Sequence, residues 1–203
     1  MQHESEVTSR LGVGDAPVGD RTGYFDHYFE RLTDRLALVS HSDLDAIAVL
    51  LQSAGDKGRK VIVAGNGGSA AMASHVSVDL TKTAGVRSVT FNESDLITCF
   101  ANDYGYEHWL ERAMDCYGDA HDVAILISSS GRSANIVNAA HEARRKGLAV
   151  VTFSGFDPAN PLRQVGHTNF WVDSTEYNIV EMVHHIWLVA VIDRIVANKS
   201  AGV

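Results

Sequence analysis

The chain has 203 residues, 45% of them hydrophobic and 21% charged, which is usual for one globular domain. Its formal net charge of −8 argues against general nucleic-acid binding, because a phosphate backbone is bound by a basic surface. No apolar run approaches the roughly 20 residues of a membrane span, and the N-terminus does not resemble a signal peptide. We therefore expect a cytoplasmic protein that binds neither nucleic acid nor membrane. Cys99 and Cys116 imply no disulfide framework and are expected as buried thiols.

The first part of the chain predicts a tail and a helical arm. Residues 1–21 show no apolar period and are expected to form a flexible tail, with a single domain over 22–203. From Tyr24, apolar residues recur at three- and four-residue steps, which predicts a helix. A second helix is expected from Ser42, with this serine as its N-cap. Both helices are amphipathic, and we expect them to pack against another subunit.

From residue 60 onward, strand-like and helix-like segments alternate. Short apolar runs predict five strands, over residues 60–64, 86–91, 123–128, 148–154 and 168–172. Helical patterns cover residues 70–81, a stretch from Leu96, residues 133–146 and a long closing segment, 178–198. This alternation indicates an α/β fold with a five-stranded parallel sheet flanked by helices on both faces.

The first strand ends in a glycine-rich loop, residues 65–69 (GNGGS), which we call the first loop. Its three glycines let the backbone approach a ligand closely and adopt positive φ angles. The helix that follows directs its N-terminal amides at the same place, which favours an anion. Alone, the pattern also fits an ordinary turn between a strand and a helix.

A second loop, residues 128–133 (SSSGRS), follows the third strand and strengthens the anion interpretation. It carries four hydroxyl groups in six residues, beside the free amides of another helix. Two such loops at the carboxyl ends of strands lie where open α/β sheets bind ligands. The chain has neither a GxGxxG motif nor a P-loop lysine, so dinucleotide and P-loop sites fit poorly. The pair of loops predicts a phosphate site.

Three motifs in order, GNGGSAAMASHVSVDL, SDLITCFANDYGYEHW and ISSSGRSAN, resemble the SIS (sugar isomerase) domain family. Within it they resemble the phosphoheptose isomerases, which convert sedoheptulose 7-phosphate into a heptose 7-phosphate. The resemblance runs from Tyr24 to the C-terminus. It implies a flavodoxin-like, doubly wound domain and a homotetramer whose active sites are shared between subunits. The residues that it implies for binding substrate and phosphate are Asn66, Gly67, Ser69, Asp103, Ser128, Ser129, Ser130 and Ser133.

An aldose–ketose interconversion needs a base that moves a proton between carbons and an acid or metal that stabilises the intermediate. The family uses a carboxylate one helical turn after a histidine, often with zinc between them. His75 and Asp79 have this spacing and share one helix face, with Asp where the family usually has Glu. By spacing alone, such a pair is more often a simple helix contact than part of a site.

The closing helix supplies further candidates, Glu181, His184 and His185. The family pattern has Gln or Glu, a histidine three residues later and another eight residues later. In that register Val189 replaces the last histidine. His185, one turn earlier on the same face, is the candidate substitute, with His184 as the alternative; otherwise one proton-transfer group is lost. The predicted catalytic residues are Asp79, Glu181 and His185, and the predicted ligands of one Zn²⁺ per active site are His75, Asp79, Glu181 and His185.

The resemblance implies one of two functions. The first is an aldose–ketose isomerase that acts on sedoheptulose 7-phosphate by enediol-type proton transfer. The second is a non-catalytic SIS protein, either a sugar-phosphate-binding regulator or a factor associated with replication initiation, which keeps the fold and loops without the catalytic carboxylates. Asp79 and Glu181 favour the enzyme, whereas Val189 favours the alternative.

Overall fold

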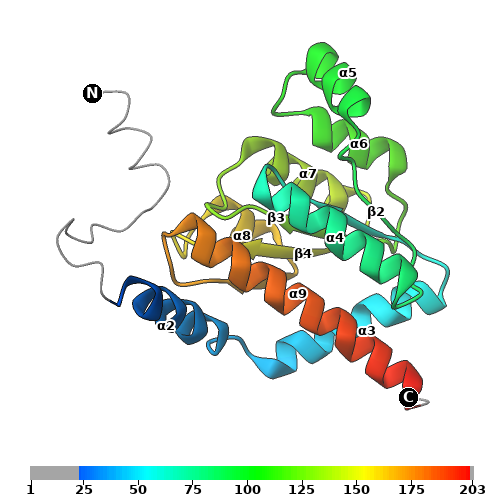
Figure 1. Ribbon diagram of the computed structural model, residues 1–203. Helices are drawn as coiled ribbons and strands as arrows, with labels where there is room; N and C mark the ends of the chain where they lie inside the picture. The colour runs from blue at the N-terminus through cyan, green and yellow to red at the C-terminus, as the bar shows by residue number, and fades with distance from the viewer. Residues whose placement is uncertain (1–22, 202–203) are drawn as a thin grey trace, which may run out of the picture.

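The computed structural model describes residues 23–201 (Figure 1). The tail expected over residues 1–21 lies outside this range. The helices and strands follow one another in the order α2 (Tyr24–Leu36), α3 (His41–Asp56), β1 (Val61–Ala64), α4 (Gly68–Lys82), β2 (Ser88–Val89), α5 (Ser94–Tyr104), α6 (Trp109–Tyr117), β3 (Val123–Ile127), α7 (Ala134–Arg145), β4 (Ala149–Ser154), α8 (Pro161–Val165), β5 (Thr168–Trp171) and α9 (Tyr177–Ser200).

The five strands form one parallel sheet in the order β2-β1-β3-β4-β5. This is the flavodoxin-like order, so the predicted fold is confirmed. The chain winds outward in both directions from β1 and β3, and the crevice beside their carboxyl ends is the usual ligand site of such sheets. The first loop follows β1 and the second loop follows β3. The topology alone therefore brings the two loops to the same edge.

The sheet separates two apolar cores, because successive side chains of a strand point to opposite faces. Val61 and Val63 of β1 enter the core beneath α3, α4 and α9, whereas Ile62 and Ala64 enter the core beneath α6, α7 and α8. Strands covered on both faces read as continuous apolar runs, which is why they were predictable. Figure 1 shows α4 and α9 running beside each other on one face of the sheet.

Several local boundaries differ from the prediction. Ser40, rather than Ser42, caps α3, and its Oγ accepts a hydrogen bond from the amide of Asp43 at 3.3 Å. The stretch expected as one helix from Leu96 is two helices, because Gly105 with φ +87° ends α5. The second strand shortens to two residues, since as an edge strand it pairs with β1 alone.

Helix α8 was missed altogether. Its start carries the usual signals in only five residues: Asn160 accepts a hydrogen bond from the amide of Arg163 at 3.0 Å, and Pro161 follows directly. The expected burial of Cys99 and Cys116 is also wrong, since both are free and exposed. Cys99 belongs to α5, which has no buried residue. Among the helices of residues 23–201, none is long and apolar enough to cross a membrane.

The N-terminal arm packs on the closing helix while leaving apolar side chains exposed. Trp187 Nε1 of α9 donates to the carbonyl of Leu36 at 3.2 Å, and Arg31 pairs with Glu176 at 3.1 Å. Phe25 and Phe29 of α2, by contrast, are exposed by 70% and 57%. The arm is therefore attached to the domain and still presents an aromatic surface.

His184 is part of the core beneath α9. It is fully buried against the rings of Phe153 and Trp187, and its Nε2 lies 3.0 Å from the carbonyl oxygen of Ser154. Because a carbonyl only accepts, Nε2 carries the proton. Nδ1 has no hydrogen-bond partner within the described chain. Burial lowers the pKa of His184 to about 4, although the hydrogen bond to Ser154 acts in the opposite direction.

The buried imidazole makes stability depend on pH. Unfolded His184 binds a proton below pH 6.5 but the folded side chain does so only near pH 4, so its stabilising effect is lost as pH falls between these values. Between pH 7 and pH 5, the wild type should lose about 2 kcal/mol more unfolding free energy than His184→Gln, which keeps a donor for Ser154. Urea unfolding at both pH values measures this difference, and identical pH dependence in the two proteins would contradict it.

Candidate functional site

The first loop is shaped to hold an anion at the start of α4. Gly67 adopts φ 52° and ψ −121°, a conformation that side chains disfavour, and α4 begins at the next residue, Gly68. The first amides of α4 therefore lack helical partners and carry the positive end of the helix dipole. Ser69, in the first turn, is buried. Asn66, Gly67 and Ser69 thus lie beside these free amides at the start of α4.

The second loop brings its hydroxyl groups together at the start of α7. Ser128 Oγ donates to Ser133 Oγ at 3.2 Å, and the amide of Arg132 donates to Ser130 Oγ at 3.3 Å. Gly131 has φ +65°, and a Cβ at this position would collide with the Asn160 side chain. Ser128 and Ser129 are buried beneath the loop. A glycine is required here because the Asn160 side chain occupies the space that a Cβ would need.

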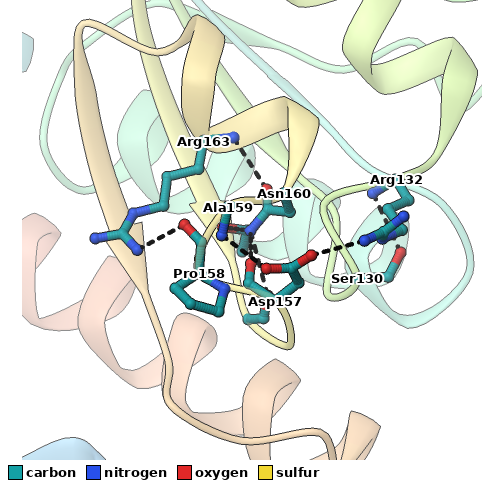
Figure 2. A network of polar contacts seen from close by, with 9 residues as sticks. Ser130, Arg132, Asp157, Pro158, Ala159, Asn160 and Arg163 are labelled. Atoms are coloured by element: carbon teal, nitrogen blue, oxygen red, sulfur yellow. Dashed lines mark hydrogen bonds and ion pairs between the residues drawn. The ribbon is translucent and has the colours of Figure 1, made fainter.

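The segment between β4 and α8 forms an ion pair with the second loop (Figure 2). The guanidinium of Arg132 pairs with Asp157 at 2.7 Å, and Asp157 also accepts a hydrogen bond from the amide of Ala159 at 2.9 Å. The Ala159 amide, assisted by Arg132, lowers the pKa of the Asp157 carboxyl. Arg132 is therefore held by a carboxylate of its own chain.

A side-chain link between the loops was not predicted. Asn66 and Asn135 exchange two hydrogen bonds, at 3.0 and 2.9 Å, and Tyr106 Oη donates to Asn66 Oδ1 at 3.2 Å. Asn135 belongs to the ISSSGRSAN motif and Tyr106 to the motif before it. Their position inside motifs was the only signal in the sequence, and it did not identify the partners.

Glu181 of α9 lies over the start of α4 and beside the second loop. A Cβ on Gly68 would meet its carboxylate, and Ser129 Oγ donates to its Oε1 at 3.4 Å. Burial raises the pKa of the Glu181 carboxyl, while the hydrogen bond from Ser129 opposes the rise. Glu181 therefore stands between the two loops, with a carboxyl that keeps its proton to higher pH than an exposed glutamate.

One turn further along α9, His185 meets His75 of α4. His185 Nε2 lies 2.8 Å from His75 Nδ1, and the two rings are nearly perpendicular, with centroids 4.9 Å apart. On the other side of the ring, His75 Nε2 lies 3.1 Å from Asp79 Oδ2. We call Asp79, His75 and His185 the relay. The structure thus joins three of the four predicted metal or catalytic side chains.

The relay has one arrangement of protons when both rings are neutral. A carboxylate accepts, so His75 Nε2 carries hydrogen toward Asp79; Nδ1 of His75 then accepts from Nε2–H of His185. This leaves Nδ1 of His185 as the basic nitrogen. Burial and the neighbouring His75 lower the pKa of His185, whereas Asp79 raises it. The net lowering favours neutral His185, the form that can accept a proton.

The donor types of the relay suit zinc, but their spacing does not. Two nitrogens bound tetrahedrally at about 2.0 Å from zinc lie about 3.3 Å apart. The 2.8 Å between the His75 and His185 nitrogens is instead a hydrogen-bond distance. In the part of the chain from 23 to 201, no three His, Cys, Asp or Glu side chains are grouped to hold a metal ion. The arrangement is therefore not a preformed zinc site.

Asp103 is the one predicted site residue that lies on α5. It is exposed in the last turn of α5 and accepts a hydrogen bond from its neighbour Asn102 at 2.9 Å. Figure 1 shows α5 projecting from the body of the domain. A single copy of the chain thus gathers the residues of both loops, α4 and α9, but not the one on α5.

Comparison with known proteins identifies the same region. The SIS domain profile matches residues 24–155. The phosphoheptose isomerase of Enterobacter sp. (strain 638) is 39% identical over 115 residues, which are 54% of this chain and 60% of that protein. That of Serratia proteamaculans (strain 568) is 38% identical over 134 residues, covering 61% and 69%.

Among solved structures, the phosphoheptose isomerase of Neisseria gonorrhoeae superposes with a TM-score of 0.77 at 24% identity. The superposition covers 84% of this chain and 95% of that one, and it establishes a shared fold. The family profile covers more than half of the chain and includes the first loop, the relay residues on α4 and the second loop. The chain therefore belongs to the SIS domain family, with the phosphoheptose isomerases among its relatives.

Proposed function

We propose that this protein is an aldose–ketose isomerase that converts sedoheptulose 7-phosphate to a heptose 7-phosphate. The observation that carries the proposal is the row of titratable groups, Glu181 and then the relay, which begins between the two anion-binding loops. The curated relatives named phosphoheptose isomerase support the reaction class and a phosphoheptose as substrate or product, and sedoheptulose 7-phosphate is our choice within that class. A cytoplasmic location remains a prediction from the sequence.

The phosphate would bind between the loops without any lysine. The hydroxyl groups of the second loop and Ser69 supply neutral donors, and α4 and α7 add the positive ends of two helix dipoles. Such a site attracts a dianion even though the chain carries a net charge of −8. With the phosphate fixed there, the reacting end of the sugar extends along the packing line of α4 and α9.

We assign proton transfer to His185 and Glu181. Nδ1 of His185 takes a proton from C1 of the ketose while the protonated Glu181 carboxyl donates to the C2 oxygen, which forms an enediol. In the return step, Glu181 carboxylate takes the proton of the C1 hydroxyl. The His185 imidazolium, whose N–H exchanges with solvent, protonates C2, which leaves the aldose. Asp79 acts through His75, because it stabilises the imidazolium charge that the relay carries in between.

Zinc is a separate proposal on which no step above depends. We propose that one Zn²⁺ per site is held by His75, Asp79, Glu181 and His185 once the hydrogen bond between the two imidazoles has opened. Bound there, it would stabilise the charge on an enediolate oxygen. Elemental analysis of the purified, dialysed protein should find one zinc per chain in the wild type and less than about a tenth of that in His75→Ala. Equal zinc in both proteins would remove His75 from the ligand set.

A homotetramer with shared active sites is the third proposal. It is supported by the exposed aromatic residues of α2 and by α5, the helix of Asp103, which projects from the body of the domain. Light scattering on the eluting protein should give four times 22.0 kDa. The double substitution Phe25→Ser and Phe29→Ser should reduce that mass, because it removes apolar area that would be buried between subunits. A monomeric wild type would contradict the assembly.

The alternative function, a non-catalytic sugar-phosphate-binding protein, is favoured by Val189, which stands where the family pattern has a histidine. Both functions require the loops, so phosphate binding does not distinguish them. Incubation with sedoheptulose 7-phosphate in deuterated buffer does. The isomerase should incorporate deuterium at the carbon next to the carbonyl, whereas a binding protein should incorporate none, with or without added zinc.

Replacing Asp79 by Asn tests the relay. The amide keeps the shape but cannot stabilise an imidazolium, so kcat should fall by at least about 100-fold while KM changes less than about threefold. Asp193→Asn is the matched control, a carboxylate-to-amide change at an exposed position of α9 that should leave kcat unchanged. Steady-state kinetics with sedoheptulose 7-phosphate measures both, and a wild-type kcat in Asp79→Asn would exclude the relay from catalysis.

A further inference from the structure

The side-chain amide of Asn66 takes part in three hydrogen bonds to residues outside its own loop. Its Nδ2 donates to Asn135 Oδ1 at 3.0 Å, and its Oδ1 accepts from Asn135 Nδ2 at 2.9 Å. Asn135 is 2% exposed and is the second residue of α7. The two amides therefore form a closed, largely buried pair that ties the loop after β1 to the helix after β3.

Tyr106 completes this arrangement from a third segment, between α5 and α6. Its hydroxyl donates to Asn66 Oδ1 at 3.2 Å. An amide oxygen has two lone pairs, and both are now used, one by Asn135 and one by Tyr106. The amide nitrogen has two hydrogens, and the Asn135 bond uses one. The remaining N–H is the group with which Asn66 can meet a ligand.

The orientation of the Asn66 amide decides whether it attracts or repels an anion. The two ends of an amide have nearly the same shape, so the side chain can rotate by half a turn unless hydrogen bonds distinguish oxygen from nitrogen. A rotated amide would direct its oxygen at the anion site. A joint half-turn of both amides would keep the reciprocal bonds, with Tyr106 Oη accepting instead of donating, so these contacts fix the plane of the Asn66 amide. A bound anion then selects the orientation in which Asn66 presents an N–H.

We propose that Asn135 and Tyr106 are positioning residues that hold the amide plane of Asn66 where it can donate an N–H to the phosphate group of the substrate. This inference rests on the proposed sugar-phosphate site, and it adds two residues that act through a third. Both come from elements other than the first loop, so formation of the phosphate site requires α7 and the segment after α5 to be in place.

A double-mutant cycle tests whether Asn135 acts through Asn66. Asn135→Ala should raise the dissociation constant of inorganic phosphate and the KM of sedoheptulose 7-phosphate about tenfold each, with kcat within about threefold. In an Asn66→Ala background, the same change should have less than about twofold effect, because no amide remains to be oriented. Independent, multiplying effects of the two substitutions would overturn the proposal.

Two further variants separate positioning from general stability. Tyr106→Phe removes only a hydroxyl from a half-exposed ring and should raise both constants about threefold, again only while Asn66 is present. Asn138→Ala is the matched control, since Asn138 also lies on α7 and donates to the carbonyl of Glu107 at 2.9 Å. Asn138→Ala should change neither the dissociation constant of phosphate nor the KM of the sugar by more than Tyr106→Phe does. A control effect as large as that of Asn135→Ala would reduce the pair to a structural role.

Calorimetry with inorganic phosphate keeps this inference distinct from the proposed reaction. If the wild type binds phosphate but does not isomerise the sugar, the isomerase proposal fails, and the binding arm of the cycle still decides the role of Asn135. If the wild type binds no phosphate, the inference is overturned together with the phosphate site. If all variants bind phosphate as the wild type does, the inference alone is overturned.

Discussion

The packing of α4 against α9 is the constraint on which the candidate site depends. Both helices lie on one face of the sheet and bury apolar side chains in the same core, among them Val76 and Leu80 of α4 and Val183 and Leu188 of α9. Each such side chain contributes about 1.5–3 kcal/mol when buried, whereas one hydrogen bond contributes about 1 kcal/mol. The core therefore fixes the helices, and the contact between His75 and His185 follows from it. The four-residue spacing then places Glu181 at the loops and His185 one turn away.

Burial shifts the pKa values of the two proposed proton-transfer groups in opposite directions. Burial disfavours the charged form of any group, so it raises the pKa of the Glu181 carboxyl and lowers that of the His185 imidazole. Both shifts move the two groups toward the protonated acid and the neutral base that an enediol reaction needs at its start. Asp79 limits the lowering at His185 through the relay, and Ser129 limits the rise at Glu181. Both groups thus remain able to exchange protons.

Much of the fold was predictable because the strands of this sheet are buried on both faces and read as apolar runs. The loops were predictable as a pair, because two Ser/Gly segments follow apolar strands whose carboxyl ends lie at the same edge of the sheet. The link between Asn66 and Asn135 was not, since 69 residues separate the partners and no periodicity relates them. The short helix α8 was missed because five residues show no helical period.

The period of an α-helix separates the roles of the neighbours His184 and His185. Adjacent residues of a helix point about 100° apart, so the two imidazoles cannot share a face. Val180, His184 and Leu188 form a buried four-residue stripe, whereas Glu181 and His185 form the next stripe, which faces α4. The family register leaves both histidines open, because Val189 interrupts the pattern there. Packing assigns His184 to the core and His185 to the relay.

The central claim is that one sugar phosphate spans the two loops and the row formed by Glu181 and His185. A crystal structure of His185→Gln with sedoheptulose 7-phosphate tests it most directly, since this variant should bind the ketose without converting it. We expect the phosphate to lie between the first and second loops. The C1 and C2 atoms of the sugar should lie beside Glu181 and residue 185. A phosphate bound elsewhere, or a sugar directed away from α9, would contradict it.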